Sequence, residues 1–271
     1  MPNQMERATA FKALHERDRP FLIPNPWDAG TTRLLESLGF EALATTSLGV
    51  SIMLGRHRST AEQILDNVRL ICGATSLPVN ADLEDCFATE PKEAVTMITR
   101  AAEYGAVGGS IEDATFDANG PPVHGFDLAV ERVHAAVEAA RALPFPFMLT
   151  ARAETLYHKT GGLDETIRRL KAYEAAGADV LYAPGLYSLE DIRTVVGELS
   201  KPLNLVMGFA DPSLTLPQLA DAGVKRISIG AGLSRIAMKS FLDSAKDMLA
   251  GQFGFVRDMA PINELRDAFG T

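Results

Sequence analysis

The sequence predicts an α/β fold, specifically a (β/α)8 barrel, and two observations lead to this prediction. Eight short apolar runs alternate with amphipathic helical stretches at regular spacing, which is the order of parallel β/α units. The length of 271 residues suits one such barrel, because this fold typically needs about 250 residues. The expected strands lie at residues 21–24, 42–46, 78–82, 108–112, 146–152, 180–184, 202–207 and 226–230.

Helical periodicity occupies the segments between these runs, at residues 29–37, 61–72, 91–104, 128–142, 163–176, 189–199 and 216–222. Glycine follows several of these segments and predicts a left-handed helix end there, at Gly39, Gly105, Gly177 and Gly223. A helical tail over 233–269 carries more apolar residues than a capping tail needs, which favours packing against another subunit. No linker interrupts the chain, so we expect one domain over 1–271, with the barrel at about 20–235 and C-terminal helices at 236–271.

Composition and charge exclude several classes of function. Hydrophobic residues make up 46% of the chain, so a large core is feasible, and the net charge of −9 argues against nucleic acid or an anionic membrane as partners. The two cysteines form neither a disulfide framework nor a zinc motif, and the charged N-terminus does not resemble a signal peptide. We therefore expect a cytoplasmic protein. The absence of a dinucleotide loop or Walker pattern predicts that neither NAD nor ATP binds.

Acidic and amide side chains follow one another on every second residue of the third expected strand. Asn80, Asp82 and Glu84 would share one face of that strand, because side chains at i, i+2 and i+4 do so. The next strand ends in Glu112 and Asp113. Two neighbouring strands that end in oxygen ligands predict a hard-cation site, most simply Mg²⁺ held partly through water. The alternative is that these acids only begin the next helices or lie in water.

Polar residues also collect after the other expected strands. A (β/α)8 barrel carries its chemistry at the carboxyl ends of its strands. Such residues follow strands one, two, five and seven, among them Asn25, Trp27, Asp28, Thr45, Thr46, Ser47, Arg152, Glu154 and Asn204. This distribution predicts an enzyme.

At this point the sequence resembles the isocitrate lyase / phosphoenolpyruvate mutase superfamily over roughly residues 20–235. The matching segments include Pro26-Trp27-Asp28-Ala29, Thr45-Thr46-Ser47-Leu48-Gly49, Val79-Asn80-Ala81-Asp82-Leu83-Glu84, Ile111-Glu112-Asp113, Thr150-Ala151-Arg152-Ala153-Glu154 and Pro202-Leu203-Asn204. The resemblance implies a Mg²⁺-dependent barrel, with Mn²⁺ as the alternative metal, that breaks or forms a C–C or P–C bond in small α-keto or 2-hydroxy acids. It also implies a homotetramer, or a dimer, in which the last barrel helix is exchanged between subunits.

The resemblance assigns the metal-binding roles to the acidic strand ends. Asp82 corresponds to the direct metal ligand, and Asn80, Glu84 and Glu112 correspond to residues that hold its water shell. For Glu84, the alternative is that it caps the following helix.

The resemblance also assigns the substrate-binding roles. The backbone amides of Ser47 and Leu48, together with Thr46, correspond to donors for the keto oxygen and carboxylate. Arg152 corresponds to the clamp on the substrate anion, a task that suits a guanidinium because it holds a carboxylate through two parallel hydrogen bonds. Such a site would stabilise the enolate that forms when the adjacent bond breaks.

Four positions depart from the family pattern. No Lys-Lys-Cys-Gly-His lid is present, and the segment after strand four, 114–125, has no lysine. Arg58 lies near the place of a family aspartate, and Cys86-Phe87-Ala88 replaces the usual Gly-Tyr-Gly. We therefore expect a lyase that cleaves a C–C bond. The alternatives are a phosphonopyruvate-type hydrolase or mutase and a non-catalytic barrel that binds α-keto acids.

Three further side chains keep two interpretations each. His124 lies in a Gly- and Pro-flanked loop, where it either transfers protons near neutral pH or is an ordinary exposed histidine. Asn204 interrupts an apolar strand, so its amide is satisfied either across the barrel interior or by substrate. Trp27 packs over the barrel mouth, with or without contact to substrate. Glu154 is expected to pair with Arg152.

Overall fold

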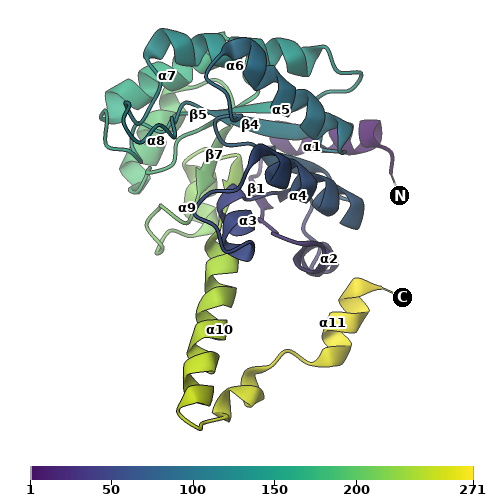
Figure 1. Ribbon diagram of the computed structural model, residues 1–271. Coiled ribbons are helices and arrows are strands. Elements are labelled where there is room, and N and C mark those ends of the chain that lie inside the picture. Colours follow the sequence, from purple (N-terminus) through teal and green to yellow (C-terminus); the bar gives the residue numbers. More distant parts are fainter. Residues whose placement is uncertain (1, 271) are drawn as a thin grey trace.

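Eight parallel strands form the predicted barrel (Figure 1) in a computed structural model that describes residues 2–270. Their order is β1-β8-β7-β6-β5-β4-β3-β2, and the backbone N–H of Ala44 donates to the carbonyl of Pro24 (3.0 Å) across the remaining seam between β1 and β2. The fold class is therefore confirmed. The strands are β1 (Phe21–Ile23), β2 (Leu43–Ala44), β3 (Val79–Asp82), β4 (Gly108–Glu112), β5 (Met148–Arg152), β6 (Val180–Tyr182), β7 (Leu203–Val206) and β8 (Arg226–Ser228).

Helices follow each of the first seven strands, as the sequence periodicity predicts. They begin at polar caps such as Asp28, Thr60 and Ser188, whose side chains accept hydrogen bonds from the first turn. The glycines expected at helix ends do have positive φ, for example 102° at Gly177 and 84° at Gly223. The helices are α2 (Ala29–Ser37), α3 (Ser47–Met53), α4 (Ala61–Ala74), α5 (Pro91–Glu103), α6 (Phe126–Arg141), α7 (Leu163–Ala175), α8 (Leu189–Glu198) and α9 (Leu216–Asp221).

An additional helix, α1 (Gln4–Glu16), closes the amino-terminal end of the barrel. Its apolar residues Ala8, Phe11 and Leu14 form one cluster with side chains from the beginnings of several strands, among them Phe21 and Val180. The sequence analysis did not predict this helix. The carboxyl ends of the strands are left as the open end of the barrel.

The chain leaves the barrel after β8 in a long helix, α10 (Gly232–Leu249), that projects away from the other helices (Figure 1). A 3-10 turn, η1 (Gly254–Asp258), and a short helix, α11 (Ile262–Phe269), then lead back toward α2, where Arg33 Nη1 donates to the carbonyl of Phe269 at 2.8 Å. The tail is thus helical, as expected, but interrupted. None of the helices within residues 2–270 has both the length and the apolar character needed to span a membrane.

Candidate active site

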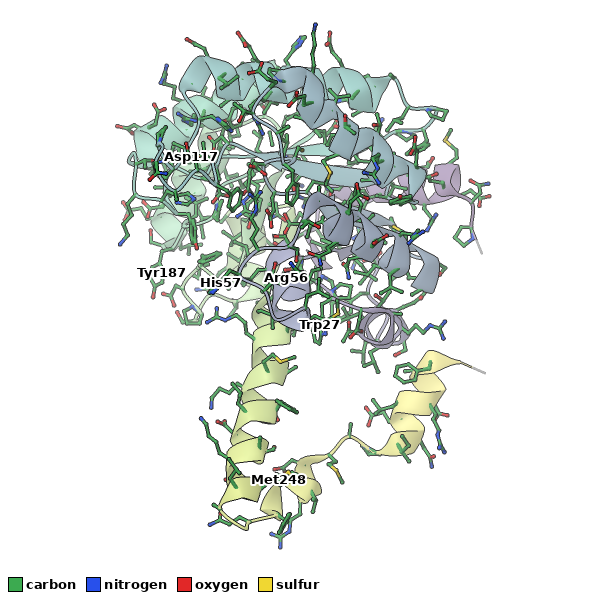
Figure 2. All side chains as sticks on the ribbon, in the orientation of Figure 1. Trp27, Arg56, His57, Asp117, Tyr187 and Met248 are labelled. Carbon is green, nitrogen blue, oxygen red and sulfur yellow. The ribbon has the colours of Figure 1, made fainter. Side chains whose placement is uncertain are left out.

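The polar residues that follow the strands do meet at the open end of the barrel. Figure 2 shows Trp27, Arg56, His57 and Tyr187 at the end from which α10 projects. A cavity of about 70 Å³ opens into the barrel here. Its lining residues come from all eight strands or the residues just after them and are Ile23, Asn25, Ala44, Thr45, Asn80, Asp82, Ser110, Arg152, Tyr182, Asn204, Arg226, Ser228 and Gly230.

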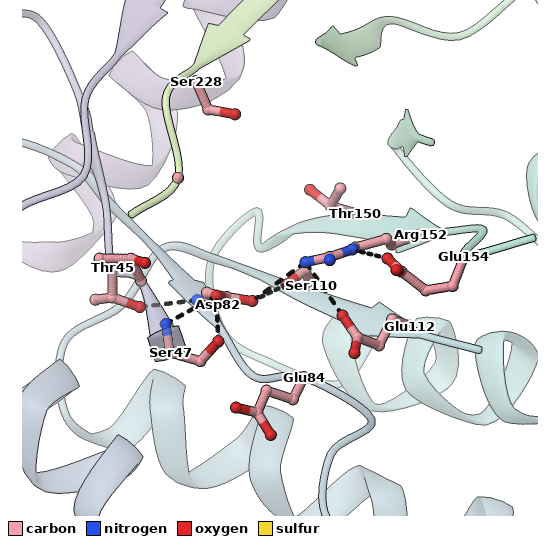
Figure 3. Close-up of polar contacts among 12 residues, drawn as sticks. Thr45, Ser47, Asp82, Glu84, Ser110, Glu112, Thr150, Arg152, Glu154 and Ser228 are labelled. Carbon is pink, nitrogen blue, oxygen red and sulfur yellow. Dashed lines mark hydrogen bonds and ion pairs between the residues drawn. The ribbon is translucent and has the colours of Figure 1, made fainter. Parts of the chain in front are cut away.

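Asp82, the last residue of β3, is held by the first residue of α3. Its Oδ2 atom accepts hydrogen bonds from both the backbone N–H and the hydroxyl of Ser47, each 2.9 Å long (Figure 3). The backbone N–H of Asp82 donates to Thr45 Oγ1 at 2.8 Å. The other oxygen, Oδ1, lies 3.5 Å from Ser110 Oγ and 3.9 Å from Arg152 Nη1 and can still take a ligand.

Arg152, the last residue of β5, lies among buried carboxylates. Its Nη1 atom is 3.1 Å from Glu112 Oε2, and its Nε atom donates to Glu154 (Figure 3). Its guanidinium also lies 4.9 Å from the centre of the Tyr182 ring. The predicted pairing of Arg152 with Glu154 is therefore confirmed. Burial raises the pKa of Glu112, an effect that the Arg152 charge opposes. Arg152 is thus already neutralised by protein groups.

Glu84 turns away from Asp82 and binds Arg58. Oε2 of Glu84 is 2.7 Å from Arg58 Nε, and Asp85 Oδ1 is 2.6 Å from Arg58 Nη2. The positive φ of Glu84, 53°, produces this turn and places Arg58 against the face of Phe116. Burial raises the pKa of Glu84, and the hydrogen bond from Arg58 opposes the shift. Glu84 does not cap a helix, so that alternative is wrong.

A site for the predicted metal would need ligands other than carboxylates. Across residues 2–270, no three carboxylate, thiol or imidazole groups converge closely enough to hold a metal. Asn80 contributes a buried Oδ1 atom that has no hydrogen-bond partner among these residues, and its side chain lines the cavity beside Asp82. Asn80 and Asp82 line the same cavity, and Mg²⁺ in proteins binds through one or two protein oxygens and keeps several waters. The donors present thus fit the predicted metal.

Asp113, predicted as an oxygen ligand, does not line the cavity. Its Oδ2 accepts from Arg169 Nη1 (2.8 Å) and from the Tyr173 hydroxyl (2.6 Å), and its Oδ1 accepts from the backbone N–H of Glu154 (2.7 Å). These bonds join β4, β5 and α7. Asp113 therefore supports the site rather than binding a ligand, and the prediction was wrong for this residue.

His124 is buried, so its interpretation as an exposed loop histidine is wrong. Its backbone N–H donates to the carbonyl of Asp113 at 2.7 Å, and its Nε2 atom has no partner among residues 2–270. Burial lowers the pKa of His124, which keeps the ring neutral near neutral pH. The residue lines a second hollow together with Arg58 and Phe116.

The remaining predicted substrate-binding residues differ in whether they line the cavity and whether their polar groups already have partners. Thr46 caps α3 through its hydroxyl, which accepts from Gly49 N at 3.2 Å, and Leu48 is half exposed on the first turn. Trp27 is half-buried, with its Cβ near Gly49, and does not line the cavity. Asn204 does line the cavity, but its amide already donates to Ser228 Oγ (3.2 Å) and accepts from Arg226 Nε (2.8 Å). The interior alternative for Asn204 is therefore confirmed.

Several cavity residues were not singled out from the sequence, among them Ser110, Tyr182, Arg226 and Ser228. Ser110 and Tyr182 belong to expected strands, but a serine inside a glycine run and an aromatic ring both look like ordinary core positions. Arg226 begins β8 rather than ending it, so the rule that barrel chemistry lies at carboxyl ends passes over it. The alternation of side chains along β8 was the only available signal.

Comparisons with known proteins agree with this geometry. A sequence model described as phosphoenolpyruvate phosphomutase matches residues 11–249. A "putative lyase/mutase" structure from Burkholderia cenocepacia J2315 is 48% identical with a TM-score of 0.95, and the match covers 99% of this chain and 97% of that one. A 2,3-dimethylmalate lyase, described as a PEP mutase/isocitrate lyase superfamily member, is 26% identical with a TM-score of 0.84, over 99% and 95% of the two chains. An oxaloacetate decarboxylase of Paraburkholderia xenovorans (strain LB400) is 29% identical over 89% of this chain and 82% of its own length.

Proposed function

Since the chain belongs to the phosphoenolpyruvate phosphomutase family of enzymes, we propose that it is a Mg²⁺-dependent lyase acting on a small α-keto or 2-hydroxy carboxylate. The reaction is the cleavage of a C–C bond next to the carbonyl or hydroxyl carbon, through an enolate. The observation that carries this proposal is the position of Asp82, held by Ser47 at the open end of the barrel with one carboxylate oxygen still available.

Asp82 and Asn80 would hold the metal, and Glu112, at the end of the neighbouring strand β4, would order its waters. When bound there, Mg²⁺ supplies positive charge to the carbonyl and carboxylate oxygens of the substrate. The N-terminus of α3 would supply the backbone N–H of Leu48 as a donor, since that of Ser47 already binds Asp82. Charge that develops on the substrate oxygen is therefore met by fixed donors.

Arg152 would orient the substrate, since its guanidinium is fixed by Glu112 and Glu154 and lines the cavity. Glu112 and His124 are the groups proposed to move protons. His124 fits that role because its Nε2 atom has no hydrogen-bond partner among residues 2–270. The names of two relatives, an oxaloacetate decarboxylase and a 2,3-dimethylmalate lyase, contain a keto acid and a 2-hydroxy acid and support this substrate class.

The assembly proposed for the enzyme is a homo-oligomer, a tetramer or a dimer, built through α10. The support is a set of exposed apolar side chains on that projecting helix: Ile236, Phe241, Leu242, Met248 and Leu249. Leu249 is 91% exposed, which is unusual for an apolar residue in a helix that packs within its own subunit.

Proton NMR of the protein with Mg²⁺ tests the function. The panel contains oxaloacetate, 2-methylisocitrate, isocitrate, 4-hydroxy-2-keto acids and phosphonopyruvate. We expect one C–C substrate to be consumed by the wild type and by the surface control Asp66→Asn, but not by Asp82→Asn. Isothermal titration should show loss of Mg²⁺ binding in Asp82→Asn while its circular dichroism stays unchanged.

Other outcomes would contradict the proposal in distinct ways. Unchanged turnover in Asp82→Asn would remove Asp82 from the site. Release of phosphate from phosphonopyruvate would assign P–C chemistry instead. Broadening of keto-acid resonances that depends on Asp82, without turnover of any panel member, would assign a binding protein.

A further inference from the structure

The floor of the cavity carries a buried arginine, Arg226, that the proposed reaction does not use. Arg226 is the first residue of β8, is 3% exposed, and lines the cavity with Asn204 and Asn80. Below it, α1 closes the barrel with Phe11 and its neighbours. A guanidinium therefore lies between an apolar plug and the space where substrate would enter.

All the hydrogen-bond partners of Arg226 are neutral groups. Its Nε donates to Asn204 Oδ1 (2.8 Å), its Nη2 to Thr150 Oγ1 (2.9 Å), and its Nη1 lies 3.4 Å from His15 Nε2. His15 accepts here as a neutral ring, because its Nδ1 is placed to donate to the Phe11 carbonyl at 2.8 Å. A guanidinium has five N–H donors, so two have no partner among residues 2–270.

The charge of Arg226 is also uncompensated. None of the ion pairs found within residues 2–270 includes it, whereas Arg152 has Glu112, Glu154 and Asp82 within 4.0 Å. Burial lowers the pKa of Arg226 to about 9, which expresses the cost of keeping this cation away from water. Buried charges in proteins are normally paired, so an unpaired one facing a cavity indicates a missing anion.

We propose that Arg226 forms an anion subsite at the cavity floor that takes the distal carboxylate of a dicarboxylic substrate. This inference rests on the proposed function, since the other end of the diacid would lie at Asp82 and Ser47. The strands set the separation: Thr150, which Arg226 contacts, precedes Arg152 by two residues, or about 6.6 Å along the strand. A diacid of four or five carbons can reach between two such layers. A monoacid of the same length would leave Arg226 unpaired.

Paired ligands that differ only in the distal group test the proposal. Binding is measured by isothermal titration with excess Mg²⁺ for 2-oxoglutarate against 2-oxovalerate and for malate against 2-hydroxybutyrate. In the wild type we expect one diacid to bind about 10- to 100-fold more tightly than its monoacid, the usual gain from a charge-assisted hydrogen bond. In Arg226→Met we expect this preference to vanish while monoacid and Mg²⁺ affinities remain unchanged.

The same titrations contain the outcomes that would overturn the proposal. Equal affinities within both pairs in the wild type, or an unchanged preference in a folded Arg226→Met, would make Arg226 a purely structural residue. If formate or chloride raises the melting temperature of the wild type as much as the diacid does, and the rise needs Arg226, the subsite holds a free anion and not a substrate group.

A second variant and a separate measurement of turnover complete the test. If Arg226→Met does not fold, Arg226→Lys replaces it, and we expect a several-fold fall in the preference for the diacid because an ammonium cannot provide the fork of donors. An unchanged preference there would overturn the proposal. The titrations measure binding, and the proton NMR panel measures turnover. A preference for the diacid in the titrations, with no turnover of any acid in the panel, would refute the proposed lyase activity and leave the subsite standing.

Discussion

His15 should make the protein sensitive to acid, because its ring is buried in a neutral form beside a cation. The ring packs edge-on between Phe11 (4.7 Å) and Phe21 (4.9 Å) and accepts from Arg226. Burial first, and the Arg226 charge second, lower the pKa of His15 from 6.5 to about 3. In the unfolded chain both effects are lost.

The sign and size of the effect follow from this difference. As the pH falls below 6.5, the unfolded chain binds a proton that the folded protein does not, so stability is full above pH 6.5 and is lost toward pH 3. Between about pH 8 and pH 5, the free energy of unfolding should fall by about 2 kcal/mol from His15 alone. The fall reaches this size because about 1.5 pH units separate pH 5 from the unfolded-state pKa.

Urea unfolding at these two pH values measures the effect in His15→Gln and in the wild type. We expect the difference in unfolding free energy between the two pH values to be smaller by about 2 kcal/mol in the variant. His134→Gln is the matched control, since His134 lies on the surface of α6 with a side chain that is 60% exposed. Should His15→Gln lose as much stability as the wild type on acidification, the buried neutral histidine would not be its source.

Two further substitutions test the site and the assembly. Arg152→Met should destabilise the fold by about 3 to 5 kcal/mol in urea unfolding, because two buried carboxylates lose their partner, while the half-exposed Arg141→Met should cost less than about 1 kcal/mol; similar values for both would contradict the buried network. Phe241→Asp should shift the protein to a smaller species in size-exclusion chromatography with light scattering, and Ser240→Asp, which adds the same charge beside it, should not. An unchanged mass in Phe241→Asp would exclude this side chain from the interface.

The fold and half of the site could be predicted because they depend on local order. Strand periodicity places the apolar runs, and the carboxyl end of each parallel strand then locates Asp82, Glu112 and Arg152 without knowledge of the packing. The same rule explains the error at Asp113, which immediately follows Glu112 and so faces the opposite side, where Arg169 and Tyr173 bind it.

The other half of the site could not be predicted, because it depends on contacts between segments that are distant in the sequence. Glu84 lies on the same alternation as Asp82, but a positive φ turns it to Arg58, 26 residues earlier. Arg226 meets Thr150 across 76 residues and His15 across 211. A pattern read along one strand cannot supply such pairs, because each requires the barrel to close and α1 to enter its end. The exposed face of α10 could be anticipated from composition, but its direction could not.

The two arginines of the cavity lie at different depths and have different surroundings. At the mouth, Arg152 lies within 4.0 Å of three carboxyl groups, those of Asp82, Glu112 and Glu154, so its charge is met by the protein. At the floor, Arg226 is positive and its partners are neutral. A ligand that satisfies both ends must bring a metal-binding group at one end and a negative charge at the other. Because Arg152 is already neutralised, its removal should chiefly harm folding and orientation, whereas removal of Arg226 should change which acids bind.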